Sequence, residues 1–181
     1  YIDYNGDGIV NLNDRVAVSQ MNYPQTTMSL NLGLEYKGWG LNAMLYAPLG
    51  VYKLQFDQYL WDFPDGNIKA QPNTLDRWTP EKINSNQIIR PATHLDKRQN
   101  AVQSTYSYAN HSYLRLKQLE ISYKFPKKLL KPLSITACQF YVKGNNLLTF
   151  SGVDNRIDPE TGGADSYPIV RTYTVGTRIT F

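Results

Sequence analysis

The sequence lacks three features that would place it in a common class of proteins. It has one cysteine, Cys138, so no disulfide can form within the 181 residues, and only 2 histidines. No run reaches the roughly 18 uncharged apolar residues of a transmembrane helix, although a membrane β-barrel stays open because its strands alternate polar and apolar residues. The net charge of +4 is spread along the chain. We therefore exclude a disulfide scaffold and a helical membrane bundle, and expect no nucleic-acid partner.

Catalytic motifs are missing as well. No Gly-rich phosphate loop follows a strand, and neither a nucleophile elbow nor a zinc motif is present. His94 and His111 stand alone in loop sequence, without Cys or Asp at ligand spacing, and are expected to be solvated. Asp158 and Glu160 lie close in sequence, but no partner for either is visible. The chain is therefore predicted not to be an enzyme.

The chain does have many tyrosines, 14 in all, and a strict alternation of apolar and polar residues. The alternation covers residues 28–36, 41–51, 113–125, 138–145 and 172–181. Its phase flips near Lys117 and Gln118, which indicates either a β-bulge or the point where the strand emerges from an apolar layer. We predict an all-β, antiparallel fold, in which Cys138 lies on an apolar strand face.

Short and long connections alternate along the chain. Residues 37–40 and 126–132 make short turns, whereas gaps of roughly 60 and roughly 20 residues separate the other strands. This asymmetry is typical of outer-membrane barrels, with a soluble antiparallel sandwich as the alternative. Five strands cannot close a barrel, which needs at least about 8. Since Tyr1 is neither an initiator Met nor part of a leader, we expect a piece of a longer polypeptide.

The first residues match the template of a calcium-binding loop. Asp3, Asn5 and Asp7 stand at its first three ligand positions, and Gly8 stands at its sharp turn. The predicted Ca²⁺ ligands are Asp3, Asn5, Asp7, the Ile9 carbonyl, Asn11 and Asp14. Asp14 replaces the usual Glu, which shortens the reach to the ion. The alternative is an Asx- and Gly-rich turn that its own side chains stabilise.

Aromatic side chains gather among amides and carboxylates in the longest connection. The candidate ligand or partner residues are Tyr59, Trp61, Trp78, Tyr106 and Tyr108. Aromatic faces beside hydrogen-bonding groups suit sugars, but the same residues could pack within the loop or contact a partner protein. Both interpretations remain open.

Taken in order, several motifs resemble the C-terminal end of a SusC/RagA-family TonB-dependent transporter. They are Asp3-Tyr4-Asn5-Gly6-Asp7-Gly8, Glu35-Tyr36-Lys37-Gly38, Arg77-Trp78-Thr79-Pro80, Ser112-Tyr113-Leu114-Arg115-Leu116-Lys117, Gly144-Asn145-Asn146-Leu147, Asp158-Pro159-Glu160 and Arg171-Thr172-Tyr173. The resemblance implies the last five strands of a transmembrane barrel of about 22 strands in the bacterial outer membrane. It also implies import of oligosaccharides, or of peptides, with a SusD-like surface lipoprotein and with a TonB complex that acts through the missing N-terminal part. Phe181 resembles the terminal signal for barrel assembly.

The resemblance divides the chain into segments. It implies extracellular loops at 1–25, 53–111 and 151–170, hairpins at 26–52 and 112–150, and a terminal strand at 171–181. The apolar faces would meet lipid, and the expected lumen-facing residues are Asn31, Glu35, Gln139, Lys143, Asn145 and Arg178. Tyr36, Trp39, Tyr113, Tyr123 and Tyr173 are expected in aromatic girdles.

The leading alternative is a soluble, calcium-stabilised β-sheet module that binds carbohydrate. The calcium loop resembles a dockerin repeat, but dockerins carry two such loops followed by paired helices, and this sequence has one and no paired helices.

Overall fold

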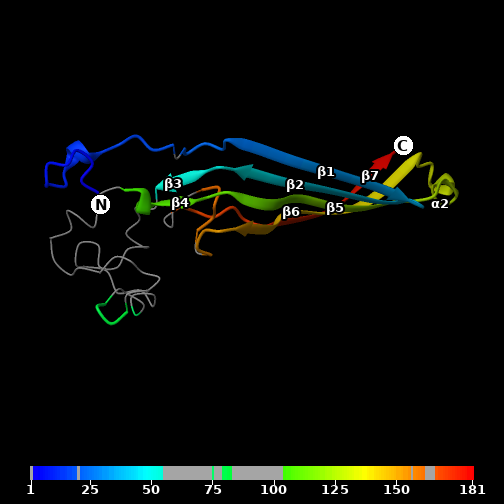
Figure 1. Ribbon diagram of the computed structural model, residues 1–181. Helices are drawn as coiled ribbons and strands as arrows, with labels where there is room; N and C mark the ends of the chain where they lie inside the picture. The colour runs from blue at the N-terminus through cyan, green and yellow to red at the C-terminus, as the bar shows by residue number, and fades with distance from the viewer. Residues whose placement is uncertain are drawn as a thin grey trace.

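One long antiparallel sheet dominates the computed structural model, which describes residues 2–19, 21–54, 75, 79–82, 104–155, 157–161 and 166–181. Its strands lie in the order β1-β2-β5-β6-β7. They are β1 (Thr26–Tyr36), β2 (Trp39–Leu49), β5 (Tyr113–Lys124), β6 (Ala137–Ser151) and β7 (Thr172–Thr180). The predicted all-β antiparallel fold is confirmed, and Figure 1 shows the sheet as a narrow, extended slab.

Tight turns lie at one end of the sheet and longer connections at the other (Figure 1). Lys37 and Gly38 both have positive φ, 47° and 89°, and form a two-residue turn that pairs Tyr36 with Trp39. This turn is shorter than the expected residues 37–40. The β5–β6 turn contains the short helices α2 (Lys127–Leu130) and η5 (Lys131–Leu133). We call this the turn end, and the opposite end the loop end.

Small elements lie at the loop end. The 3-10 helix η1 (Leu12–Asp14) belongs to the N-terminal segment. The strands β3 (Tyr52–Leu54) and β4 (Tyr108–Asn110) pair with each other, and the 3-10 helix η4 (Thr105–Ser107) precedes β4. The connection expected at 53–111 therefore begins and ends in a paired strand, because the backbone continues extended beyond β2 and before β5.

The register gives the sheet one apolar face. One row across the five strands reads Leu34, Leu41, Ile121, Val142 and Val175, and the neighbouring row contains Leu32, Ala43, Leu119, Gly144 and Tyr173. These side chains are not covered by the described part of the chain: Leu34 is 67% exposed and Val175 is 65% exposed. A water-soluble sandwich would bury such a patch, so this face requires an apolar surrounding.

The opposite face is polar. All six residues expected to face a lumen lie on this face, as the pairing of the strands shows. They are Asn31, Glu35, Gln139, Lys143, Asn145 and Arg178. Glu120 and Ser122 lie on it in β5 and are 8% and 4% exposed. The alternation therefore separates polar from apolar residues along all five strands.

A β-bulge explains the phase flip in β5. The register of β5 shifts between Leu116 and Gln118 against β6, and the pairing of β2 with β5 shifts at the same level. Lys117 is the extra residue, and its ammonium lies on the polar side, 5.1 Å from the ring centroid of Tyr46. Leu116 and Leu119 consequently stay on the apolar face. Of the two explanations that the sequence allowed, the bulge is confirmed.

Aromatic residues border the apolar face at the turn end. Tyr36, Trp39, Tyr123 and Phe140 occupy one row, and the rings of Trp39 and Tyr123 lie 4.9 Å apart. Tyr113 does not belong to such a girdle, contrary to expectation. It is 5% exposed on the polar face, where its hydroxyl donates to Glu160.

No helix among the described residues has the length and apolar character needed to cross a membrane.

Candidate functional site

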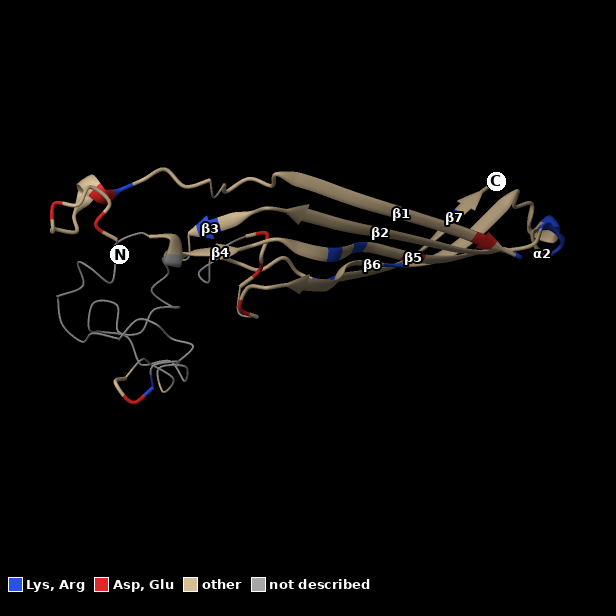
Figure 2. Ribbon diagram, viewed as in Figure 1, with Lys and Arg blue, Asp and Glu red and all other residues tan. Residues whose placement is uncertain are grey.

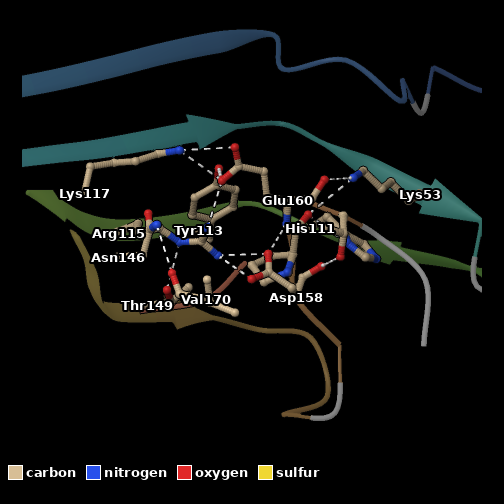
Figure 3. A network of polar contacts seen from close by, with 12 residues as sticks. Lys53, His111, Tyr113, Arg115, Lys117, Asn146, Thr149, Asp158, Glu160 and Val170 are labelled. Atoms are coloured by element: carbon tan, nitrogen blue, oxygen red, sulfur yellow. Dashed lines mark hydrogen bonds and ion pairs between the residues drawn. The ribbon is translucent and has the colours of Figure 1, made fainter. Parts of the chain in front are cut away.

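A cluster of charged residues lies on the polar face near the loop end (Figure 3). The first half of β5 supplies Tyr113, Arg115 and the bulge residue Lys117, whose side chains share this face. Residues 157–161, which we call the acidic loop, belong to the β6–β7 connection and fold back onto them. Ile157 anchors the acidic loop by its burial and by the hydrogen bond from its amide to the Asp154 carbonyl, at 2.9 Å.

Arg115 is the centre of the cluster and is 1% exposed. Its Nη2 donates to both carboxylate oxygens of Asp158, at 2.9 and 3.0 Å, and its Nη1 donates to Glu160 Oε2 at 2.8 Å. Its Nε donates to Thr149 Oγ1 on β6 at 2.9 Å. The planar guanidinium thus uses its fork geometry to join the sheet to the acidic loop.

Glu160 collects further donors around the same centre. The Tyr113 hydroxyl donates to Glu160 Oε2 at 2.9 Å, and Lys117 Nζ lies 3.1 Å from both carboxylate oxygens. Lys53 on β3 donates to the backbone carbonyls of Pro159 and Glu160, at 3.4 and 2.8 Å. Two cationic side chains, Arg115 and Lys117, therefore pair with the two carboxylates, and a third, Lys53, binds the backbone of the acidic loop.

Asp158 is held in its charged form. Burial by itself would raise its pKa, but the hydrogen bonds from Arg115 and from the Glu160 amide, with the positive charge of Arg115, hold the pKa of Asp158 below its usual value. The expectation that Asp158 and Glu160 have no partner is wrong, because the chain brings Arg115 and Lys117 to them from 43 to 45 positions away.

His111 also belongs to the cluster, and the expectation of a solvated histidine is wrong for it. Its side chain is 0% exposed, and its Nδ1 lies 3.3 Å from the Pro159 carbonyl oxygen. Because a carbonyl can only accept, this contact is a hydrogen bond when Nδ1 carries the proton. Burial lowers the pKa of His111, and the positive charge of Lys53 lowers it further against the effect of Pro159.

The N-terminal loop is a separate, exposed group of oxygen atoms. The Asp3 carboxylate accepts from the amides of Gly6 and Gly8, both at 2.7 Å. The Asp14 carboxylate accepts from the amides of Tyr4 and Asn11, at 2.8 and 2.7 Å. The hydrogen bond from the Asn11 amide contributes most to holding the pKa of Asp14 below its ordinary value. Positive φ at Gly6 and Gly8 permits these bends.

The fit of this loop to Ca²⁺ is mixed. Carboxylate, amide and carbonyl oxygens in this order are the donors that the hard cation prefers. However, no three His, Cys, Asp or Glu side chains gather as a metal group within the described ranges. Asn11 donates to the Ile9 carbonyl at 3.2 Å, and Asn5 Oδ1 accepts from the Asp7 amide at 2.9 Å. These hydrogen bonds within the loop are the ones expected for an Asx- and Gly-rich turn that its own side chains stabilise. Binding of Ca²⁺ by the loop stays a prediction.

The aromatic candidates fall mostly beyond what the structure describes. Tyr59, Trp61 and Trp78 lie outside the described residues, as do His94 and the side chain of Tyr106. Tyr108 begins β4 opposite Leu54 and is half-buried. A sugar contact and packing within the loop both stay predictions for Tyr108.

Comparison with known proteins finds relatives that match the whole chain. No protein-family model matches it. TonB-dependent receptor P3 of Formosa agariphila is 30% identical over the whole chain, and TonB-dependent receptor P26 of the same organism is 28% identical over the whole chain. The chain is similar along its whole length to one segment of these TonB-dependent receptors. It spans 19% of the length of each of these relatives, both of which are named as receptors rather than as enzymes.

Solved structures agree on the fold of this receptor segment. The RagAB peptide importer in its "open-open" state matches 96% of the chain with a TM-score of 0.74 and 23% identity, over 19% of its own chain. The "closed-closed" state of the same importer matches 97% of the chain with a TM-score of 0.70 and 22% identity. The resemblance to the SusC/RagA family is confirmed, and the sheet corresponds to part of such a receptor's barrel. The protein is located in the outer membrane.

Proposed function

We propose that this chain forms part of the wall of an outer-membrane importer for oligosaccharides, with peptides as the alternative substrate. The observation that carries the proposal is the sheet itself, which has an uncovered apolar face and a polar face that binds a loop through Arg115. An apolar outer face and a polar lumen are what a transporting barrel requires. The names of the relatives support uptake through a TonB complex, and the RagAB structures support peptides as the alternative.

In this proposal the Arg115 cluster positions the acidic loop rather than performing chemistry. Its buried guanidinium is paired with two carboxylates, which avoids the cost of an isolated buried charge. Asn146 on β6 attaches the same connection at a second point, because its side-chain amide donates to the Val170 carbonyl at 3.3 Å. A connection fixed at both points offers a defined surface at the loop end. A SusD-like lipoprotein closing over that end is the proposed partner.

The import proposal is tested with the full-length receptor in its native host. A strain without the receptor gene is grown on oligosaccharides or on peptides as the sole nutrient, and uptake of the labelled compound is measured. Loss of growth and uptake on one class, restored by the intact gene, supports import and identifies the substrate class. Unchanged growth and uptake on both classes contradict the proposal.

We also propose that the N-terminal loop binds Ca²⁺ through Asp3, Asn5, Asp7, the Ile9 carbonyl, Asn11 and Asp14. The order of oxygen donors and the positive φ of Gly8, 81°, support it. Calorimetry of the full-length receptor with Ca²⁺ is the test, with a D3N/D7N variant as the control. Heat of binding that the variant loses supports the site, whereas identical traces for both proteins contradict it.

A further inference from the structure

The β5–β6 turn presents an unusual combination of exposed residues. Lys127, Lys128 and Lys131 are exposed, and none of them forms an ion pair with any residue that the structure describes. Leu129 and Leu133 lie between and beside these lysines and are 62% and 65% exposed. We call residues 126–133 the basic turn. Figure 2 shows its positive charge at the turn end, opposite the acidic residues of the loop end.

The basic turn has a defined backbone. Leu130 is 5% exposed and fixes the turn to the sheet, and its carbonyl accepts from the Ile135 amide at 3.4 Å. The Leu129 amide donates to the Pro126 carbonyl at 3.0 Å, and Ser134, with φ 55°, ends the turn. Because one leucine is directed inward, the other two remain on the surface with the lysines.

Neighbouring charges behave differently. Lys124 pairs with Glu35 at 2.8 Å, and Lys37 lies 5.1 Å from the ring centroid of Tyr36. The three lysines of the basic turn have no such partner among the described residues, which leaves three positive charges and two leucines for a partner outside the chain.

The position of the basic turn identifies the partner. It lies at the same end as the aromatic row that contains Trp39 and Tyr123, where the apolar face reaches its border (Figure 1). At that border a membrane changes from acyl chains to phosphate groups. Exposed leucines fit the acyl boundary, while ammonium groups on flexible stems reach anionic phosphates. A soluble acidic partner would use the lysines and leave the leucines in water.

We propose that the basic turn binds anionic phospholipid headgroups of the membrane leaflet at the turn end. This inference goes beyond import and rests only on the location in the outer membrane. A lysine close to an anionic surface strengthens binding by roughly fivefold at low salt. Three lysines therefore suffice to select phosphatidylglycerol over a zwitterionic lipid at this turn.

The test uses the full-length receptor with a photo-crosslinking amino acid in place of Leu133. The receptor is reconstituted in vesicles that contain equal amounts of phosphatidylglycerol and phosphatidylcholine, and the crosslinked lipids are identified by mass spectrometry. We expect a several-fold excess of phosphatidylglycerol. K127S/K128S/K131S should abolish the excess, and the charge-preserving K127R/K128R/K131R should retain it.

Controls separate this outcome from global effects. The same label in place of Lys82, an exposed residue remote in sequence from the basic turn, should show no preference for either lipid. Equal yields of the two lipids at position 133, an excess that survives the serine substitutions, or no lipid crosslink at all would overturn the proposal. Uptake measured with the same variants tests import separately, since lipid preference does not depend on the substrate.

Discussion

The two faces of the sheet differ in which side chains they bury. On the polar face, Arg115 is almost fully buried and every charge around it is matched by a partner, as Asp158 and Glu160 show. On the apolar face, Leu34 and Val175 are largely exposed and nothing in the described residues covers them. This sheet therefore buries the charge of Arg115 against its own loop and leaves its apolar side chains exposed to lipid. A water-soluble protein does the reverse.

The largest expected effect comes from removing the central cation of the polar face. Arg115→Ala leaves the largely buried Asp158, whose side chain is 10% exposed, without its cation, and loss of the partner of a buried carboxylate typically costs about 3–5 kcal/mol. Glu160 is 35% exposed and keeps Lys117, so it adds little to this cost. We expect the acidic loop to detach, and limited proteolysis of the full-length receptor in membranes should cut the β6–β7 connection much faster. Arg115→Lys, which keeps the charge but loses the fork, should lie between. Equal cutting rates for all three proteins would mean that the cluster does not hold the loop.

Lysine substitutions on adjacent residues compare the faces directly. Leu32→Lys places a charge on the apolar face and should cost about 2–4 kcal/mol near the middle of a membrane. Asn31→Lys places the same charge on the polar face and should change stability by less than about 0.5 kcal/mol. Reversible unfolding of the receptor in lipid vesicles measures both values. The prediction fails when the two variants are equally stable.

Lowering the pH should weaken the polar face in two steps. The pKa of His111 is lowered from 6.5 by burial, so the unfolded state takes up a proton first and stability falls as the pH drops below 6.5. The pKa of Asp158 is lowered from 3.8, so its stabilising contribution is complete above 3.8 and is lost as the pH falls through the lower folded value. Thermal unfolding at a series of pH values checks this. Asp158→Asn should remove the second step and keep the first.

The sequence predicted the strands and their faces well, because an alternation of period 2 is a local property that every strand displays. The bulge at Lys117 was readable from the same signal, since the extra residue shifts the phase. The expectation of a girdle position is wrong for Tyr113, because Tyr113 shares parity with Arg115 upstream of the bulge and therefore lies on the polar face.

The charged cluster could not be predicted in the same way. Its acidic residues and its cations meet only because the β6–β7 connection folds back over β5, and such long-range contacts leave no local pattern. The burial of His111 follows from the same folding and from the pairing of β3 with β4. The sequence Asp158-Pro159-Glu160 is only a weak signal, because two nearby carboxylates need cations only where the fold takes them out of water.

The most direct test of the central claim measures which face meets lipid. Nitroxide labels are attached at Leu32→Cys and Asn31→Cys in the full-length receptor, with Cys138→Ala and any other cysteines replaced, and spin relaxation is recorded in native-like vesicles. We predict that oxygen, which dissolves in lipid, relaxes the label at position 32 more strongly, and that a water-soluble nickel chelate relaxes the label at position 31 more strongly. Equal or reversed accessibility at the two positions would show that the apolar face does not meet lipid.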